Sequence, residues 1–286
     1  MEDGFLVTPL PCLRQPLERL RLSPWRPGAW RPLLAGSAFA ALTYVQSPVA
    51  ARAGVVEDFI AAGDRYYAAA RLEDAVHAYT EAVQAGPANA TALCRLARVE
   101  SELGETQKGD EQRRTWASAV VHARDAVRAE PDSAQPHMRL AVALGRQALR
   151  EGPRTRLALS KEIKSEVDRA LALDPTQGVA WHVLAMWNVK LTGLNTFERM
   201  AANAVLGGVP KGASYENAEK AFQKAIALEP AYVNHHLEYG RLLKDLHKNE
   251  DARRELEQAI SLPATSSALD TRYQADARAL LEKLPH

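Results

Sequence analysis

Residues 218–230 read AEKAFQKAIALEP, and this stretch decides the fold. Ala218, Phe222 and Ala225 are spaced four and three positions apart, so on a helix they share one face. The two small residues allow a neighbouring helix to approach closely, while the bulky ring fills the space beside them. Pro230 lacks a backbone N–H and ends the helix five residues after the second alanine. The stretch therefore predicts a tightly packed helix followed by a turn.

The same pattern occurs three times earlier in the chain and once, in a shorter form, later. The helices that it predicts end in AVQAGP at Pro87, AVRAEP at Pro131, ALALDP at Pro175 and AISLP at Pro263. A repeated pair of helices closed by a proline is typical of the tetratricopeptide repeat. We therefore predict an all-α, tetratricopeptide-like right-handed superhelix. The positions equivalent to 218, 222 and 225 are Ala75, Tyr79 and Ala82, then Ala119, Ala123 and Ala126, then Ile163, Val167 and Ala170.

The spacing of the repeats is irregular. Successive prolines from 87 to 230 lie 44, 44 and 55 residues apart, against 34 in an ordinary repeat. We expect the two shorter excess segments, which are polar, to extend helices around a wider turn. The third, residues 192–213, is predicted to be a long insertion with an apolar helical piece at 197–206. Residues 269–284 are amphipathic and predict the capping helix that a repeat array needs.

Apolar residues in the register of a first helix precede each of these second helices. They are Phe59, Ala62, Gly63 and Tyr66, then Leu93, Leu96 and Ala97, then Leu140, Ala141 and Leu144, then Trp181, Leu184 and Ala185, and finally Tyr239, Gly240 and Leu243.

Residues 1–53 differ from this body in composition. They hold six arginines, three acids and seven prolines, and the uncharged run Leu33–Val45 is followed by Ala51-Arg52-Ala53. This order is typical of a secretory signal, and 13 residues are short of the roughly 20 that span a bilayer. We therefore expect a targeting segment cleaved after Ala53, with no stable transmembrane helix. A transit segment, a mis-set start or a disordered tail is the alternative. The helical domain is predicted to span residues 54–286.

Composition excludes several classes of protein. The 36 basic residues nearly balance the 35 acidic ones, so no global field argues for nucleic-acid binding. Two cysteines, Cys12 and Cys94, are too few for a disulfide framework or a cysteine zinc site. The sequence lacks a Gly-rich loop between strand and helix, a Gly-x-Ser-x-Gly motif and a His-Glu-x-x-His motif. We therefore expect no enzymatic activity, cofactor or metal.

Some individual side chains are of types that catalyse reactions or bind metals, but a structural role is the simpler prediction for each. His235 and His236 are adjacent and would point about 100° apart on a helix, which favours a surface or groove role over a shared metal. Glu198 and Arg199 are predicted to form a local ion pair or a solvated face, or else a buried bridge that ties the insertion to the stack. Cys94, Trp116, Trp181 and Trp187 are predicted to pack in the core.

The first helices of such a stack line its concave side. This predicts a groove of mixed character, in which the methionines are adaptable apolar contacts. Arg241 and Lys244, one turn apart, could meet a carboxylate or a phosphate; a solvated helix face is the alternative. The predicted groove residues are Tyr67, Arg98, Met138, His182, Met186, Arg241 and Lys244.

Residues 57–284 resemble the regulator of microtubule dynamics family. The specific part is HVLAMWNVKLTGLNTFERMAANAVLGGVPKGASYENAEKAFQKAIALEP, residues 182–230, together with RLAR at 95–98. The resemblance implies a tetratricopeptide-like domain with irregular repeats and an association with microtubules and spindles. The matching positions are Leu184, Trp187, Phe197, Glu198, Arg199, Pro210, Ala213, Ser214, Tyr215 and Glu216, of which Trp187, Phe197, Glu198, Arg199 and Tyr215 are expected to be structural marks of the family.

Two functions are therefore expected as alternatives. The first is a non-enzymatic scaffold that binds a protein or peptide partner in its groove, with tubulin or the microtubule implied by the resemblance. The second is a lipid- or small-ligand-binding module of a cell envelope or organelle lumen, whose insertion roofs an apolar cavity near Tyr67, Met138 and Met186. The resemblance implies a cytoplasmic, cytoskeletal location, whereas the leader implies export or organelle targeting.

Overall fold

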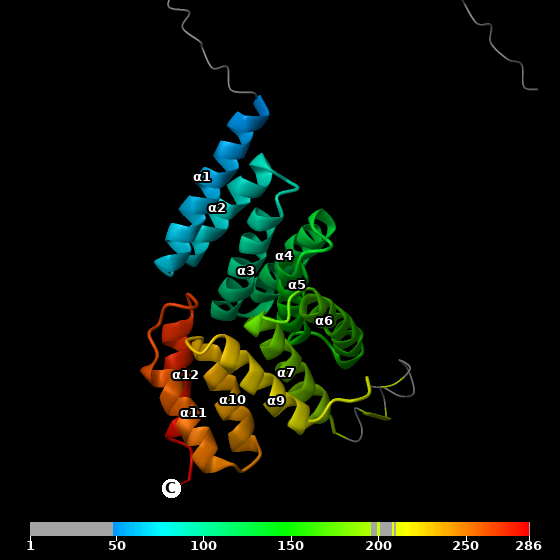
Figure 1. Ribbon diagram of the computed structural model, residues 1–286, viewed down its shortest axis with the longest axis vertical. Coiled ribbons are helices and arrows are strands. Elements are labelled where there is room, and N and C mark those ends of the chain that lie inside the picture. The colour runs from blue at the N-terminus through cyan, green and yellow to red at the C-terminus, as the bar shows by residue number, and fades with distance from the viewer. Residues whose placement is uncertain (1–47, 196–198, 201–207, 209, 286) are drawn as a thin grey trace, which may run out of the picture. The chain divides into compact units, whose positions relative to one another are not determined.

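A computed structural model describes residues 48–195, 199–200, 208 and 210–285, and the side chains from residue 53 onward within these ranges. The regular structure of these residues is entirely α-helical, without a β-strand (Figure 1). The helices are α1 (Pro48–Ala68), α2 (Leu72–Ala85), α3 (Ala90–Thr106), α4 (Gly109–Ala129), α5 (Ala134–Ala148), α6 (Pro153–Leu173), α7 (Gly178–Thr192), α9 (Tyr215–Leu228), α10 (Val233–Asp245), α11 (Asn249–Ser261) and α12 (Asp270–Leu281).

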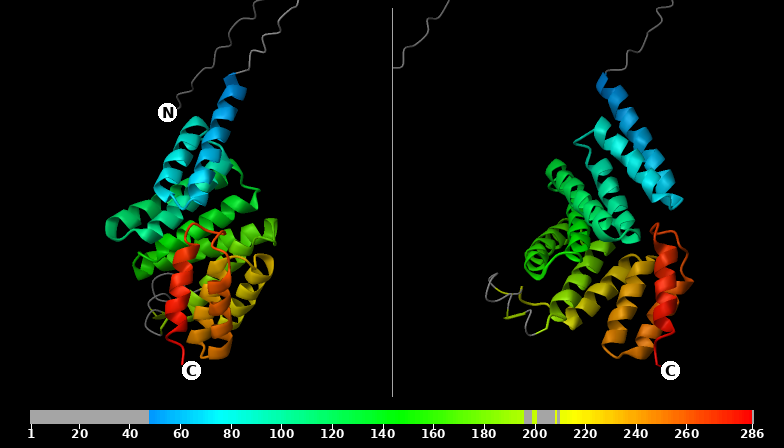
Figure 2. Two further views of the ribbon diagram at one scale, coloured as in Figure 1. Left: turned by 90° about the vertical axis from the view of Figure 1, so that its left-hand side faces the viewer. Right: turned by 180° about the vertical axis from the view of Figure 1, so that it is seen from behind.

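The helices pair in chain order and stack on one another. The pairs are α1 with α2, α3 with α4, α5 with α6, α7 with α9, and α10 with α11, and each pair packs on the next. Helix α12 packs on the last pair as a cap (Figures 1 and 2). These five hairpins and their cap confirm the predicted tetratricopeptide-like fold, and each repeat ends at the proline from which it was inferred.

Close approach within a hairpin depends on glycine in the first helix. A Cβ added at Gly63 of α1 would lie 2.4 Å from the ring of Tyr79 on α2. A Cβ added at Gly240 of α10 would lie 2.9 Å from Leu256 on α11. Tyr79 and Leu256 are almost completely buried. The small residue of one helix therefore receives the bulky residue of the other, as the sequence pattern predicts.

The two polar excess segments lengthen helices, as expected. Helices α4 and α6 each have 21 residues. The expected wider turn is wrong for the first of them, because only residues 107–108 separate α3 from α4, fewer than the three between α1 and α2. The excess is absorbed by extra helical turns, which satisfy their own backbone hydrogen bonds and need no longer loop.

In two of the hairpins, a histidine on the first helix contacts both the second helix and the turn that precedes the hairpin. His137 on α5 contacts Glu166 on α6 through Nδ1 at 2.6 Å and the carbonyl of Pro131 through Nε2 at 2.8 Å. His236 on α10 repeats this with Glu255 at 2.7 Å and the carbonyl of Pro230 at 3.0 Å. His236 is 5% exposed, so a surface position, which the sequence favoured, is wrong for it. Each ring satisfies a carbonyl at the turn that ends the preceding repeat.

The last repeat is also joined to the first two. In the connector between α11 and α12, the carbonyl of Ser266 accepts a hydrogen bond from Arg98 on α3 at 2.8 Å. The backbone N–H of Ala268 donates to the Tyr67 hydroxyl on α1 at 3.2 Å, and the Tyr67 hydroxyl donates to Glu102 on α3 at 2.8 Å. Residues of the first hairpin and of the cap belong to one hydrophobic core.

The leader and most of the insertion are outside the described residues. Helix α1 begins at Pro48, before the expected domain boundary at residue 54 and the expected cleavage after Ala53. Phe197, Glu198 and the apolar piece that follows them lie outside the described residues. Within the described residues, no helix combines the length and the apolar character needed to cross a bilayer.

Candidate binding cavity

A cavity of about 700 Å³ within the described residues is bordered mainly by first helices. Helices α3, α5, α7 and α10 supply most of its lining, α6 supplies another wall, and the cap helix α12 contributes Tyr273. The inward position of the first helices agrees with the predicted concave surface. The repeats thus place the first helices around a common space, to which one second helix, α6, also contributes.

One side of the cavity is apolar. Val142 of α5, Leu157 of α6, and Val183 and Met186 of α7 contribute to this side. Trp187 forms part of the same wall, and its indole N–H donates to the carbonyl of Ser160 at 2.8 Å, which fixes the ring against α6. This surface can hold a hydrophobic group but offers it few polar partners.

The other part of the lining contains two ion pairs, one of which links different repeats. Arg146 of α5 lies 2.5 Å from Glu105 of α3, which also accepts a hydrogen bond from Tyr273 at 3.0 Å. Burial raises the pKa of Glu105, against the opposing effects of Arg146 and Tyr273. Arg98 and Glu102 form a second pair within α3 at 3.1 Å. Each pair joins one arginine to one glutamate, so the positive and negative charges of this part of the lining neutralise each other.

Arg139 of α5 is the exception to this balance. Its side chain forms no hydrogen bond or ion pair with the other described residues, and its Nε atom is shielded from water without a partner. Burial lowers the pKa of Arg139, and the nearby positive charge of Arg98 lowers it further. The carbonyl oxygen of the Asn234 side chain, also in the lining, is buried without a partner. Arg139 therefore has an unused donor that can bind an anion, whereas the Asn234 oxygen can only accept a hydrogen bond.

Two histidines border the same polar side. The Nδ1 atoms of His182 on α7 and His235 on α10 are 3.0 Å apart, and the ring of Tyr232 stacks on His235 at 4.5 Å between centroids. Burial lowers the pKa of His182 well below its usual value, with the neighbouring His235 and Arg146 adding to the effect. Burial also lowers the pKa of His235, although Glu229 opposes it. Both rings are therefore neutral at pH 7.

The cavity gathers three of the seven predicted groove residues, Arg98, His182 and Met186. Met138 is 3% exposed and packs in the core between α5 and α6. The other three lie outside the lining. Tyr67 bonds to Glu102, Arg241 pairs with Glu238 at 2.7 Å, and Lys244 lies 3.8 Å from Asp245.

Sequence reasoning missed Arg139 and Arg146. They are seven residues apart on α5, so they share a face of that helix. Met138, chosen from the register, points about 100° away from Arg139. The signal that could have found the pair was the recurrence of arginine at heptad spacing along an otherwise apolar helix.

The residues that carried the family resemblance have structural contacts where they are described. Trp187 is buried against α6, and Tyr215 begins α9. Arg199 donates to the carbonyls of Leu191 at 2.9 Å and Thr192 at 2.8 Å, the last residues of α7. A cation at a helix C-terminus stabilises the unpaired carbonyls and the negative end of the dipole. Arg199 thus attaches the insertion to α7 through backbone carbonyls, whereas Glu198, its predicted ion-pair partner, lies outside the described residues.

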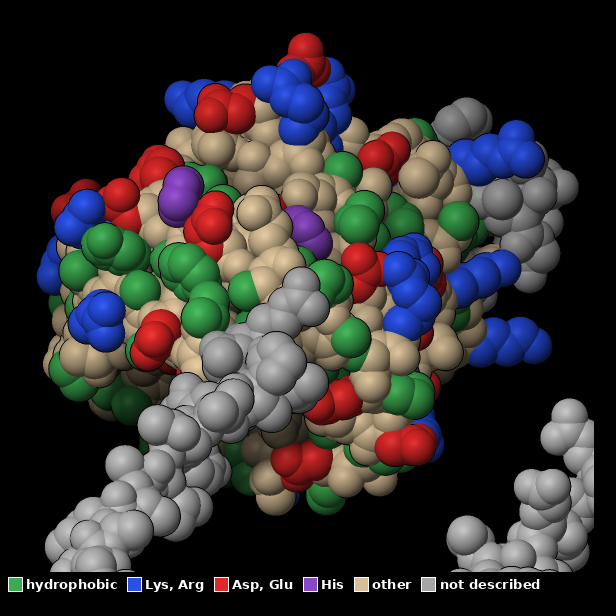
Figure 3. All heavy atoms as spheres, turned by 90° about the horizontal axis from the view of Figure 1, so that it is seen from above, with side chains coloured by type: hydrophobic (Ala, Val, Ile, Leu, Met, Phe, Trp, Pro, Cys, Tyr) green, Lys and Arg blue, Asp and Glu red, His purple; other side chains and the backbone are tan. Residues whose placement is uncertain are grey.

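The remaining chemistry of the described residues is sparse. No group of three or more histidine, cysteine, aspartate or glutamate side chains among them could hold a metal ion. Cys94 is buried, and burial raises the pKa of its thiol to about 11, which disfavours the thiolate. On the face shown in Figure 3, acidic and basic side chains are interspersed with apolar ones.

Stacked helical hairpins around an inner cavity define a protein of the tetratricopeptide-repeat class. A tetratricopeptide-repeat protein of Thermus thermophilus superposes with a TM-score of 0.57 over 77% of this chain and 98% of its own, at 17% sequence identity. The model of the regulator of microtubule dynamics protein 1-3 family matches residues 59–285. The chain belongs to this family.

Two relatives illustrate the range of similarity. Regulator of microtubule dynamics protein 3 of Bos taurus is 31% identical over 186 residues, which cover 64% of this chain and 39% of the relative. Regulator of microtubule dynamics protein 1 of Mus musculus is 24% identical over 269 residues, which cover 90% of this chain and 87% of the relative. The matched part of the chain thus spans about two fifths of the protein 3 relative and most of the protein 1 relative.

Proposed function

We propose that the chain is a non-enzymatic scaffold whose inner cavity binds a segment of a protein partner through an acidic group. The observation that carries the proposal is Arg139, a cation in the cavity wall without an acidic partner among the described residues. Arg139 is partly buried, and its shielded Nε–H is left without an acceptor, which costs about 1–3 kcal/mol for a buried polar group. A carboxylate supplied by a partner would recover much of that cost through charge-assisted hydrogen bonds.

The rest of the lining suits a segment with an apolar side chain beside the acidic one. Met186 and Val183 lie on the apolar side of the cavity, and Arg139 and His182 contribute to the polar side. The volume, about 700 Å³, is within the range of roughly 300–1,000 Å³ that is usual for ligand sites. The names of the relatives concern microtubule dynamics, so tubulin or a microtubule-associated protein is the proposed source of the segment.

A second candidate function is the binding of an amphipathic lipid or small ligand. The apolar wall, with Val142, Leu157 and Leu191, favours it. An anionic head group would take the place of the partner's carboxylate at Arg139, and the hydrocarbon part would cover the apolar wall. Both candidates use the same cation, so Arg139 alone does not separate them.

Binding to microtubules and native mass spectrometry test the two candidates together. Arg139→Met keeps the length of the side chain and removes the charge, and Arg128→Met on the exposed side of α4 is the matched control. The scaffold proposal expects co-sedimentation with microtubules that falls at least about tenfold in Arg139→Met and is unchanged in the control. Equal binding by both variants would reject the cavity as the site. A bound lipid mass in the purified protein that disappears only in Arg139→Met would favour the second candidate.

A further inference from the structure

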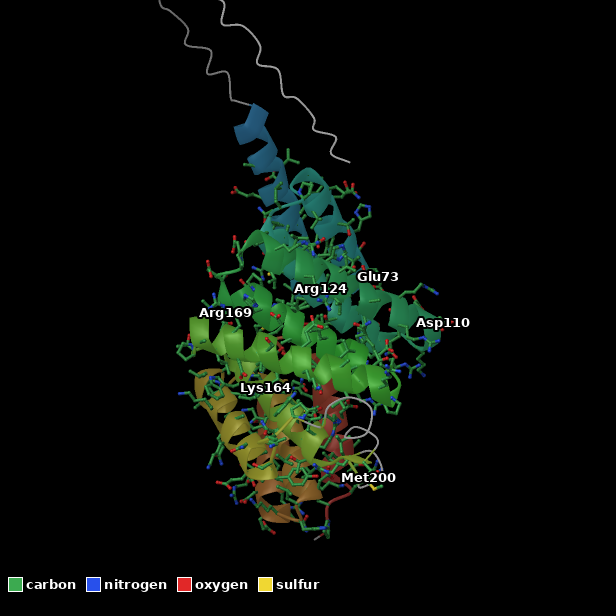
Figure 4. The ribbon with its side chains drawn as sticks, turned by 90° about the vertical axis from the view of Figure 1, so that its right-hand side faces the viewer. Glu73, Asp110, Arg124, Lys164, Arg169 and Met200 are labelled. Carbon is green, nitrogen blue, oxygen red and sulfur yellow. The ribbon has the colours of Figure 1, made fainter. Side chains whose placement is uncertain are left out.

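A second, smaller hollow lies at the end of the repeats formed by the second and third hairpins. It has a volume of about 240 Å³ and is lined by the start of α4 and the residues that follow α5. Its lining shares no residue with the inner cavity. Arg113, Arg114 and Arg150 contribute three guanidinium groups, with Trp116, Gln147 and Glu151 among the other walls. Figure 4 marks this end of α4 with Asp110.

The positive charge of this hollow is largely unpaired. Arg113 pairs with Asp110 at the surface, whereas Arg114 and Arg150 form no ion pair within the described residues. Arg154 and Arg156, at the start of α6, border the inner cavity and not this hollow. The chain as a whole has a net charge of only +1, with the leader supplying much of the basic excess. The lining has three arginines and one acid, Glu151, so the hollow carries a local excess of positive charge, although Asp110 and Glu111 lie beside it in the first turn of α4.

The floor of the hollow is rigid. Trp116 is 4% exposed, and its indole N–H donates to the carbonyl of Ser101 on α3 at 3.1 Å. Gln112 donates to the carbonyl of Gly104 at 2.7 Å, which ties the first turns of α4 to the end of α3. The guanidinium groups are thus presented by helices that are held in place. Less side-chain entropy is lost on binding when the supporting backbone is already ordered.

We propose that this arginine pocket, defined by Arg113, Arg114 and Arg150, binds an acidic segment of a protein partner at a site separate from the inner cavity. Planar guanidinium groups bind carboxylates through paired hydrogen bonds. A pocket of this volume accommodates one acidic side chain, and its three guanidinium groups are available to bind that carboxylate. An extended segment with several glutamates or aspartates is the partner of matching charge.

The alternative anionic partners fit the pocket less well. Trp116, the large apolar side chain of the lining, is buried, so the pocket presents nothing to insert into a bilayer. Its ring is also not available to stack on bases, which is the usual support for binding single strands. A protein segment is the occupant that requires only carboxylates and the hollow itself.

Fluorescence anisotropy with a labelled oligo-glutamate peptide tests the proposal on the full chain. The variant Arg113→Glu/Arg114→Glu/Arg150→Glu reverses the pocket, and Arg65→Glu/Arg254→Glu/Arg278→Glu makes the same change of net charge at exposed positions elsewhere. We expect the affinity to fall by more than about tenfold in the pocket variant and to change by less than about twofold in the control. Circular dichroism checks that both variants remain folded. The affinity of the unmodified chain should also weaken steeply at about 1 M salt, where charges are screened within about 3 Å.

Three results would overturn the proposal. The first is equal affinity of the pocket and control variants for the peptide. The second is loss of peptide binding in Arg139→Met with none in the pocket variant, which would move the acidic segment into the inner cavity. The third is pocket-dependent binding to vesicles of anionic phospholipid without binding to the peptide. Because Arg139 lies outside the pocket, failure of this proposal leaves the proposed function of the cavity standing, and the reverse is also true.

Discussion

His182 on α7 and His235 on α10 stack with their ring centroids 4.9 Å apart, and their Nδ1 atoms are separated by 3.0 Å. His235 Nε2 faces Glu229 at 3.3 Å, so the neutral His235 ring is best placed to donate from Nε2. His182 then donates from its Nδ1 to the Nδ1 of His235. Protonation of His235 would turn its acceptor Nδ1 into a donor and break this hydrogen bond. Protonation of His182 would place a positive charge in the buried contact.

The histidine pair predicts a loss of stability on mild acidification. Burial, the largest cause, lowers the pKa values of both rings below the usual 6.5. The unfolded chain therefore binds more protons as the pH falls through 6.5, and the free energy of unfolding decreases with it. Above that pH the contribution is fully present. Urea denaturation between pH 8 and about 5 should show a smaller loss in His182→Gln than in the unmodified chain. His77→Gln, at an exposed position on α2, is the control, and an unchanged pH slope in His182→Gln would contradict the prediction.

The turn histidines predict a second, larger effect. His236→Ala leaves Glu255 of α11 and the carbonyl of Pro230 without this partner, and it removes a ring that is only 5% exposed. We expect the free energy of unfolding to fall by about 2–4 kcal/mol, because a buried hydrogen-bond network and a ring are both lost. His77→Ala should change it by less than about 0.5 kcal/mol. Chemical denaturation followed by circular dichroism measures both, and a similar small change in the two variants would show that the turn contact contributes nothing.

At Gly63, in the first hairpin, a glycine-to-alanine substitution is predicted to destabilise the helix pair, although the same substitution usually stabilises a helix. Alanine in place of glycine normally stabilises a helix by about 1 kcal/mol. At Gly63 the added methyl group would lie 2.4 Å from the Tyr79 ring, so Gly63→Ala should instead destabilise the chain by about 1–3 kcal/mol. Gly145→Ala is the matched control, because no atom lies within 4 Å of a Cβ added there. Thermal unfolding should move in opposite directions for the two variants.

The repeat register of the body could be predicted from sequence because it depends on local geometry. Ala218, Phe222 and Pro230 specify which face of a helix packs and where it ends, and these properties involve neighbouring turns only. The cavity residues depend on finer detail. One position along α5 separates Met138, in the core, from Arg139, in the cavity wall, and that step is a rotation of about 100°. A register inferred from the apolar pattern is not accurate enough to decide between them.

Contacts across the array were beyond sequence reasoning for another reason. Arg98 and Ser266 are 168 residues apart, and nothing in either local pattern indicates that they meet. Their contact follows from the accumulated rotation of every hairpin between them, which small differences in packing can alter. The contacts of the turn histidines are intermediate between the locally determined repeat register and the long-range contacts across the array. His137 and His236 each follow a helix-ending proline by six residues, and this shared spacing was available in the sequence.

The joint between the first helix and the connector supplies a last prediction. The Tyr67 hydroxyl accepts from the N–H of Ala268 and donates to Glu102, so Tyr67→Phe leaves a backbone donor and a carboxylate without this partner. A loss of about 1–3 kcal/mol is expected for such unsatisfied groups. The loss should be localised, and amide hydrogen exchange of residues 266–281 should accelerate more than exchange in α5 and α6. Tyr66→Phe is the control, because Tyr66 contacts Arg71 through its ring face. If amide exchange in Tyr67→Phe accelerated equally along the chain, the connector would open only when the whole domain unfolds. That result would contradict a local opening of the contact between the first and last repeats.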